Sequence, residues 1–324
     1  MQYNMKEKML PYAFSKVEVA TARMISDHGG SSICDLSTLL GKSESTISQT
    51  VNSLEEKGIV KTERHGMKKL VDISDQNYAL SLRELLRAEP YVPWEETISN
   101  SNIVALFKNI TGEESFKLEI SSISFWRANH NLSMHGMYSS SPGKQPLRNS
   151  NLSRFISDYS DHVSRRYLTE KLPGDAIILW RSGYRCLFKI RDNAKRKPEI
   201  LPNQTFPTAL TVSPTYGIQF LTSDLYYYHD SNLTALAGED IILHTLLIDP
   251  ESQTYSTYAL LLALKNGRNI DMNLLLEKSR KYKIVDIARN LVKYINSNGR
   301  IREWPLPDPK ELREQADLYG VRMG

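Results

Sequence analysis

The sequence has little cysteine and no long hydrophobic run. Its two cysteines, Cys34 and Cys186, lie in neither a CxxC motif nor a Cys/His metal spacing, so we expect two buried thiols in a reducing cytoplasm. The most apolar run, Thr257–Leu264, is far shorter than the roughly 20 residues of a membrane span. The polar stretch Met1–Leu10 does not predict a signal peptide. We therefore expect a cytoplasmic protein with no membrane partner.

Catalytic motifs are also missing from the sequence. It contains no GxxxxGK[ST], HExxH or GxSxG. A nucleotidyltransferase needs a Gly-Ser turn followed by paired carboxylates, but Ser182-Gly183 has the reverse order and Glu239 and Asp240 are adjacent, so their side chains diverge. We expect His244 and the tyrosines of Tyr226–Tyr228 to be packing residues, although aromatic rings can also stack on bases or ligands. The sequence thus predicts no catalytic residue, metal or cofactor; an acidic pair assembled only in three dimensions would revive an enzyme.

Length and charge limit the remaining classes. With 324 residues, we expect two or three domains: 1–90, 91–172 and 173–324. Hydrophobic residues make up 40% and charged residues 24%, as in a soluble globular protein. The net charge of +4 is a weak argument for a polyanionic partner.

The first domain has the pattern of three helices followed by a hairpin. Apolar periodicity predicts a helix over Phe14–Asp27, with Ser15 as N-cap and Glu18 completing a capping box. A second helix is predicted over Ile33–Leu40 and a third over Ser45–Lys57. Ile47, Val51 and Leu54 would face the other two helices. The alternating residues of Ile59–Ile73, around His65-Gly66, predict a β-hairpin.

This order of elements is that of a winged helix-turn-helix, which places a helix in the major groove of double-stranded DNA. We expect the outer face of the third helix to contact bases and phosphates, and the hairpin to contact phosphates. The candidate DNA-binding residues are Ser43, Ser45, Thr46, Gln49, Thr50 and Ser53 on the helix, and Lys61, Arg64, His65, Lys68 and Lys69 on the hairpin.

The basic charge is confined to the hairpin. Residues 57–69 contain five Lys or Arg and one acid, a net of 5 − 1 = +4, whereas residues 1–90 contain 12 Lys or Arg and 12 Asp or Glu. DNA binding would depend on this patch and on a homodimer that presents two copies of it.

Residues 41–74, GKSESTISQTVNSLEEKGIVKTERHGMKKLVDIS, resemble the MarR-type winged helix, and the resemblance extends over about residues 12–75. It implies a DNA-binding transcriptional regulator. A winged helix that binds protein instead of DNA is the alternative.

The middle of the chain is predicted to be helical. Helices are expected at Tyr78–Arg87, Asn102–Ile110, Phe116–Phe125 and Leu152–Leu172, the last as a connector or dimerisation arm. Arg127–Asn151 shows no clean helical stripe, so a degenerate second winged helix stays an alternative. Residues 144–199 carry 13 basic and six acidic side chains, a net of 13 − 6 = +7, which indicates either a solvated surface or a second phosphate-contacting surface.

The carboxy-terminal domain is predicted to be α+β, as is the whole chain. A hairpin is expected over Ala176–Ile190, and a second strand pair from Ile218–Thr222 and Leu225–His229. The predicted helices are Asp240–Leu247, Tyr255–Lys265, Met272–Lys281, Ile284–Asn296 and Pro309–Tyr319.

Most of residues 205–321 resemble an archaeal family of winged-helix regulators whose carboxy-terminal part is nucleotidyltransferase-like, and also abortive-infection antitoxins. The segments that carry the resemblance include TALTVSPTYGIQFLTSDLYYYHD, EDIILHTLLID and WPLPDPKELREQADLYGV. We expect this domain to bind a partner protein or a small-molecule effector. An antitoxin-like regulator and an active nucleotidyltransferase are the alternatives to a simple transcriptional regulator.

Overall fold

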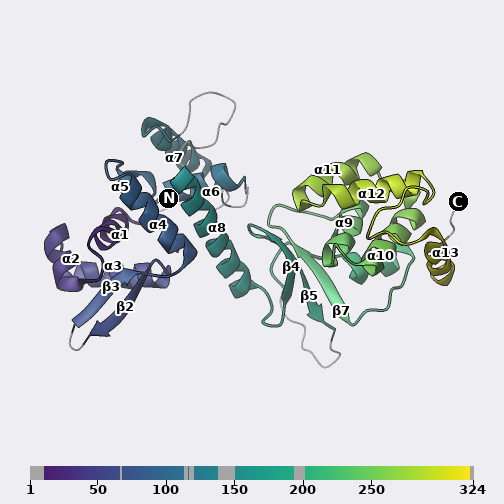
Figure 1. Ribbon diagram of the computed structural model, residues 1–324, viewed down its shortest axis with the longest axis horizontal. Coiled ribbons are helices and arrows are strands. Elements are labelled where there is room, and N and C mark those ends of the chain that lie inside the picture. The colour runs from purple at the N-terminus through teal and green to yellow at the C-terminus, as the bar shows by residue number, and fades with distance from the viewer. Residues whose placement is uncertain are drawn as a thin grey trace, which may run out of the picture. The chain divides into compact units, whose positions relative to one another are not determined.

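The computed structural model describes residues 11–65, 68–112, 116, 120–137, 150–192 and 201–321, and only the backbone of His65 and Lys68. The chain forms two compact units, Met1–Arg166 and Tyr167–Gly324 (Figure 1). Each unit contains helices and a small antiparallel sheet, so the predicted α+β class is confirmed. The first unit includes the predicted segment 1–90 together with most of the predicted segment 91–172.

The first unit begins with three helices and a hairpin. Its elements, the last of which extends into the second unit, are α1 (Lys16–His28), β1 (Ser31–Ser32), α2 (Ile33–Leu40), α3 (Glu44–Glu56), β2 (Val60–His65), β3 (Lys68–Ile73), α4 (Asn77–Ala88), α5 (Trp94–Thr97), α6 (Ser101–Thr111), α7 (Ser122–Met134) and α8 (Ser150–Lys171). The strands form a sheet in the order β1-β3-β2. The order of helices and strands is the one predicted for the first domain, and the hairpin of β2 and β3 is called the wing below; its tip at Gly66 lies outside the described residues.

Local sequence signals account for these helices. Ser15 and Glu18 form the predicted capping box at the start of α1, and Gly29 ends the helix with a positive φ. Helix α2 spans the predicted residues and has a second capping box, between Ser32 and Asp35. In α3 the predicted inner residues are fully buried: Ile47, Val51 and Leu54.

One prediction for the cysteines is wrong. Cys186 is buried in a strand of the second unit, and burial raises the pKa of its thiol to about 12. Cys34, however, is exposed. Helix α2 has one buried residue, Leu36, and Cys34 lies on the opposite side of this short surface helix because successive residues are about 100° apart.

Helix α8 packs its predicted apolar face inside the first unit. Leu152, Phe155, Ile156 and Tyr159 are buried, and the Tyr159 hydroxyl donates a hydrogen bond to the Tyr12 carbonyl at 2.9 Å. This use of the apolar face fits the connector role better than the dimerisation arm.

The helix predicted over Phe116–Phe125 is wrong in its start. Ser121 is the N-cap of α7, and its side chain accepts a hydrogen bond from the Ser124 amide. Helix α7 therefore occupies part of the stretch for which the sequence predicted no clean helix. Residues 113–115, 117–119 and 138–149 lie outside the described residues. The described part of 91–166 is helical and contains no strand from which the wing of a second winged helix could form.

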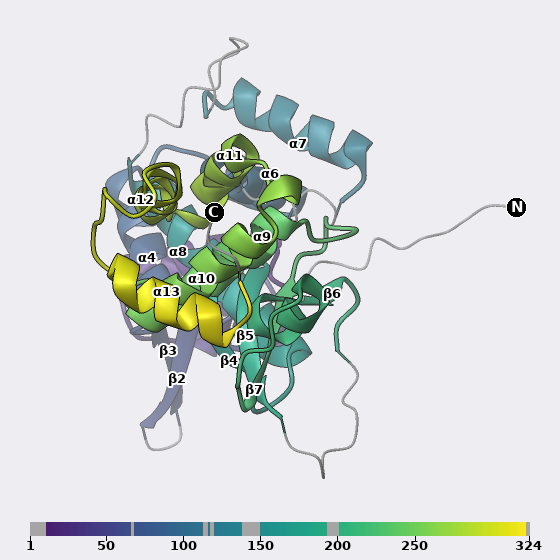
Figure 2. The same cartoon turned by 90° about the vertical axis from the view of Figure 1, so that its right-hand side faces the viewer.

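The second unit is a four-stranded sheet covered by helices. Its elements are β4 (Ile177–Ser182), β5 (Arg185–Arg191), β6 (Thr205–Pro207), η2 (Ala209–Tyr216, a 3₁₀ helix), β7 (Asp224–His229), α9 (Gly238–Ile248), α10 (Gln253–Lys265), η3 (Gly267–Asn269, also 3₁₀), α11 (Met272–Tyr282), α12 (Val285–Asn296) and α13 (Pro309–Leu318). The strands are antiparallel in the order β4-β5-β7-β6. Helices α9 to α12 gather on one face of the sheet (Figure 2).

Alternation along β5 divides the core of this unit in two. Leu187 faces the large cluster of apolar side chains from α9 to α13, whereas Cys186, Phe188 and Ile190 pack with Leu168 and Leu172 on the other side.

The predicted strand pair across Ser223-Asp224 is wrong. β7 pairs with β5 and β6 instead, and Ile218–Thr222 is not a strand. The alternating apolar residues belong to an irregular segment, in which Ile218 and Phe220 are buried while Leu221 is exposed.

Among the described helices, none is long and apolar enough to cross a membrane.

A buried ion pair fixes the end of α3 on α1. The Lys57 ammonium contacts Glu18 Oε1, and both side chains are almost fully buried. The same oxygen accepts a hydrogen bond from Ser53 Oγ at 2.6 Å, and Glu18 Oε2 accepts the Ser15 amide at 2.6 Å. One carboxylate therefore completes the cap of α1 and holds Ser53 of α3 and Lys57, the residue that follows this helix.

Glu18→Ala is expected to lower the free energy of unfolding of the first unit by about 3–5 kcal/mol, because it leaves the Lys57 charge buried and unpaired. The double variant Glu18→Leu with Lys57→Met should recover most of this loss. Urea denaturation measures both. Lys16→Ala, which breaks the exposed pair of Lys16 with Glu96, is the control and should cost less than about 1 kcal/mol. Equal stability of Glu18→Ala and Lys16→Ala would contradict this role for the buried pair.

Candidate functional site

The outer face of α3 is polar and free of basic charge. Ser45, Thr46 and Gln49 are exposed, as the sequence predicted. The Ser43 hydroxyl caps the helix by accepting the Thr46 amide at 3.2 Å and contacts the Thr46 hydroxyl at 2.8 Å. Asn52 is exposed on the same face and was missed, although its spacing of three residues from Gln49 and seven from Ser45 is a helical signal.

Two predicted DNA-contacting residues face inward instead. Thr50 is buried, and its hydroxyl donates to the Thr46 carbonyl at 2.8 Å. Ser53 donates to Glu18. Sequence reasoning placed both outside because polar residues usually lie on the surface, but here hydrogen bonds satisfy their hydroxyls within the fold.

The wing is less positive than its composition indicates. Lys57, counted in the basic patch, is buried against Glu18. Lys61 contacts Asp75 at 2.8 Å and Glu63 at 3.6 Å, and the hydrogen bond that Lys61 donates to Asp75 raises the pKa of Lys61. Lys69 lies 3.8 Å from Glu55.

Arg64 is an exposed basic side chain on the wing. It lies directly opposite Lys69 in the register of β2 and β3, and His65 lies opposite Lys68. Two cations facing each other across a hairpin repel, so a phosphate near Arg64 and Lys69 would stabilise both. The side chains of His65 and Lys68 lie outside the described residues, and their predicted DNA contacts stay predictions.

The basic stretch 144–199 lies partly outside the described residues. Lys144, Arg148, Lys195, Arg196 and Lys197 lie outside the described residues. Four others are paired within the fold, since Arg154 contacts Glu84 at 2.8 Å, Arg165 contacts Asp161 at 3.2 Å, Lys189 contacts Asp224 at 2.7 Å, and Arg166 donates to the Glu56 carbonyl at 2.8 Å.

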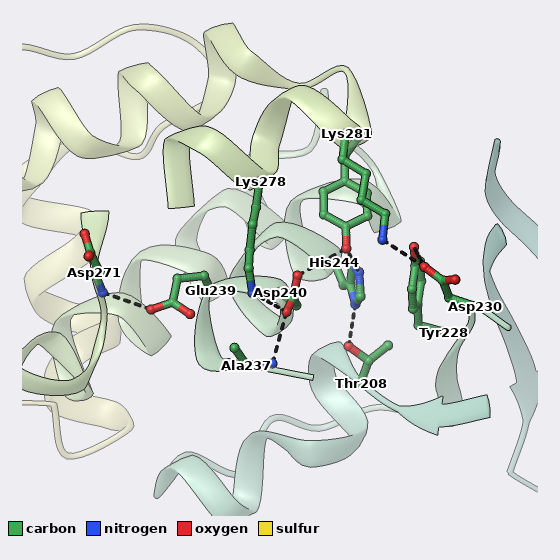
Figure 3. A network of polar contacts seen from close by, with 11 residues as sticks. Thr208, Tyr228, Asp230, Ala237, Glu239, Asp240, His244, Asp271, Lys278 and Lys281 are labelled. Atoms are coloured by element: carbon green, nitrogen blue, oxygen red, sulfur yellow. Dashed lines mark hydrogen bonds and ion pairs between the residues drawn. The ribbon is translucent and has the colours of Figure 1, made fainter. Parts of the chain in front are cut away.

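The second unit contains a buried polar network centred on His244 (Figure 3). Its Nδ1 lies 2.7 Å from Thr208 Oγ1 and its Nε2 lies 2.9 Å from the Tyr282 hydroxyl. The Tyr282 hydroxyl in turn donates to Asp240 Oδ1 at 3.2 Å. All of these hydrogen bonds can form together when Thr208 donates to Nδ1 and Nε2–H donates to Tyr282. The network therefore selects the neutral tautomer of His244 that carries its proton on Nε2.

Burial, aided by the charges of Lys281 and Lys278, lowers the pKa of His244 to about 3 against the opposing effect of Asp240. The imidazole, stacked on Tyr228 with ring centroids 4.3 Å apart, is therefore neutral at pH 7. This agrees with the prediction of a core histidine.

Two acids of the network are each paired with a lysine of α11. Asp240 Oδ2 contacts Lys278 at 2.6 Å and accepts the Ala237 amide at 3.0 Å. Burial raises the pKa of Asp240, but the hydrogen bonds from Lys278 and from the Ala237 amide, together with the charge of Lys278, outweigh this effect, so the pKa is lowered. Asp230 contacts Lys281 at 2.9 Å. These pairs connect α11 to the start of α9 and to the end of β7.

Glu239 and Asp240 serve different partners. Glu239 Oε1 accepts the Asp271 amide at 2.9 Å, at the start of α11 (Figure 3), while Asp240 binds Lys278. Within the described residues, no group of three or more His, Cys, Asp or Glu side chains is placed to hold a metal ion. The hydrogen bonds and ion pairs of the network connect α9 to α11.

Comparison with known proteins shows a likeness for part of the second unit. Residues 203–321 match a family model described as HVO_2833_C, C-terminal. No curated protein matches the chain, and no solved structure matches it. The matched segment begins before the 3₁₀ helix η2 and ends after α13, so it contains the whole His244 network.

The buried histidine makes the stability of the second unit depend on pH. In the unfolded chain His244 takes up a proton near pH 6.5, whereas in the fold it does so at about pH 3. The free energy of unfolding of the second unit is thus highest above pH 6.5. It decreases as the pH falls below 6.5, by about 2 kcal/mol between pH 7 and pH 5, because the unfolded chain then binds a proton that the fold does not. Hydrogen exchange of α9 amides measures this loss. His244→Gln should be less stable at pH 7 but flatter between pH 7 and pH 5; identical pH slopes would refute the assignment.

Proposed function

We propose that this protein is a cytoplasmic transcriptional regulator that binds double-stranded DNA through its winged helix, with α3 in the major groove. The observation that carries the proposal is the outer face of α3, where Ser45, Gln49 and Asn52 are exposed at helical spacing. Hydroxyl and amide groups of this size reach base edges and phosphates. The resemblance of residues 12–75 to the MarR-type winged helix supports the same reading.

The contacts that hold α3 in the fold support a role in DNA recognition. Its carboxy-terminal end is held by the Glu18–Lys57 pair and by Arg166, which donates to the Glu56 carbonyl. Gly58 follows with a φ of +69°, and a Cβ there would lie 2.2 Å from the Tyr78 hydroxyl. A helix fixed at one end by several independent contacts presents its outer side chains in one geometry, which sequence reading requires.

The second unit is proposed to regulate or assemble the protein by binding a partner protein or a small-molecule effector. A single winged helix covers too few base pairs for specificity in a genome, so the regulator is proposed to act as a homodimer on two half-sites.

Gln49→Ala is expected to weaken binding to the best operator by about 1–3 kcal/mol and to affect random duplex DNA much less, because an amide contact to a base edge is lost. The operator is first selected from a random library with the full-length protein, and affinities are then measured by fluorescence anisotropy. Gln76→Ala is the matched control, since Gln76 is exposed at the start of α4 and makes no side-chain cap. Equal losses on both kinds of DNA would show that Gln49 reads no base.

The wing is tested by salt dependence. Replacing both Arg64 and Lys69 with Ala should reduce the slope of log K against log salt by about 2, because each phosphate contact releases about 0.9 counterion. Lys61→Ala should leave the slope nearly unchanged, since Lys61 is occupied by Asp75 and Glu63. A double variant with the wild-type slope would remove the wing from the DNA interface.

A further inference from the structure

Helix α7 exposes a stripe of large apolar side chains. Ile123 and Trp126 are each 65% exposed and Met134 is 74% exposed. The His130 ring stacks on Trp126, with centroids 5.6 Å apart and planes within 4°. These four residues follow one another at steps of three, four and four, so they line one side of the helix.

The opposite side of α7 is anchored in the first unit. Ala128 and Leu132 are buried. Asn129 Oδ1 accepts a hydrogen bond from Asn109 at 2.7 Å, and the Asn131 amide donates to the Glu96 carbonyl at 3.4 Å. The stripe is therefore held outward by a docked helix, and an exposed apolar surface of this kind marks an interaction site.

The stripe lies in an almost uncharged part of the sequence. Between Glu119 and Lys144, Arg127 is the only Asp, Glu, Lys or Arg, although such residues make up 24% of the chain. Burying this face desolvates little charge, and two identical copies of it would not repel each other strongly.

We propose that a second copy of this chain covers the stripe, by antiparallel pairing of α7 with α7 of the partner across a two-fold axis. The stripe has an aliphatic side chain at each end, Ile123 and Met134, and two stacked rings between them, Trp126 and His130, so the order of side-chain types is the same when the helix direction is reversed. A two-fold interface needs this self-complementarity. Ile123 of one copy then lies beside Met134 of the other, with Trp126 next to the axis.

The inference deepens the proposed function, because it names the surface that brings two winged helices together. The other candidate arm, α8, uses its apolar residues within its own unit, as the burial of Phe155 and Tyr159 shows. Helix α7 belongs to the same compact unit as the winged helix, so pairing through α7 connects two DNA-reading units directly.

The size of the stripe sets the expected strength. Three large side chains exposed to this extent on each of two copies provide on the order of 800 Å², given about 150–250 Å² for an aromatic residue. A standard interface buries about 1,200–2,000 Å² in total. The free dimer is therefore weak, with a dissociation constant on the order of micromolar, and two adjacent half-sites on DNA strengthen it.

Sedimentation equilibrium of the full-length protein without DNA, from about 1 to about 100 µM, tests the interface over the micromolar range. The wild type should pass from monomer to dimer, whereas Trp126→Glu should stay monomeric over the same range with an unchanged circular dichroism spectrum. Tyr91→Glu is the control, since Tyr91 is 98% exposed in the same unit but outside the stripe, and it should dimerise like the wild type. If Trp126→Glu misfolds, Met134→Lys replaces it.

A wild type that stays monomeric at the highest concentration would overturn the proposal, since the stripe would then be covered by another protein or by another part of the chain. Dimerisation of Trp126→Glu and Met134→Lys at wild-type strength would overturn it too. The proposed function can fail separately. A protein that dimerises through α7 but binds no duplex DNA would support the dimer interface and contradict the proposed role as a DNA-binding regulator.

Discussion

The carboxylate of Glu18 is the constraint on which the geometry of the first unit depends. A buried charge is costly unless it is paired and hydrogen-bonded, and Glu18 meets this condition through the Ser15 amide, the Ser53 hydroxyl and the Lys57 ammonium. Together with the buried apolar residues Ile47, Val51 and Leu54, these contacts hold one side of α3 inward. The inner side then includes Thr50, Ser53 and Lys57, and the outer side is left with Ser45, Gln49 and Asn52.

This constraint explains how much of the candidate DNA interface could be predicted from the sequence. Capping boxes and apolar periodicity are local signals, and they placed α1, α2, the inner stripe of α3 and the wing. The inward turn of Ser53 and Lys57 depends on an acid 35 and 39 residues earlier in the chain. No local pattern reports such a partner, and a hydroxyl or ammonium without a visible partner is assigned to the surface by default.

The same division between local and distant signals applies to the second unit. Its helices have clear periodicity, and all five long ones were predicted. The sheet depends on pairing across the sequence, where β6 has only three residues and joins β7 through the register of Thr205 with His229. In the network, Asp240 and His244 are one helical turn apart on α9, but the side chains that bind them, Lys278 and Tyr282, come from α11. Sequence reasoning found the histidine and not its partners.

The distribution of charge connects the wing to the exposed stripe on α7. The fold pairs Lys57 and Lys61 closely with its own acids, so in the proposed regulator one wing offers few cations to phosphate. Affinity for DNA grows with the number of phosphates neutralised, and a single copy with so few contacts binds weakly at physiological salt. Two copies joined by a nearly uncharged helix double those contacts without adding repulsion between the subunits. In this scheme specificity comes from the polar face of α3, and affinity comes from assembly.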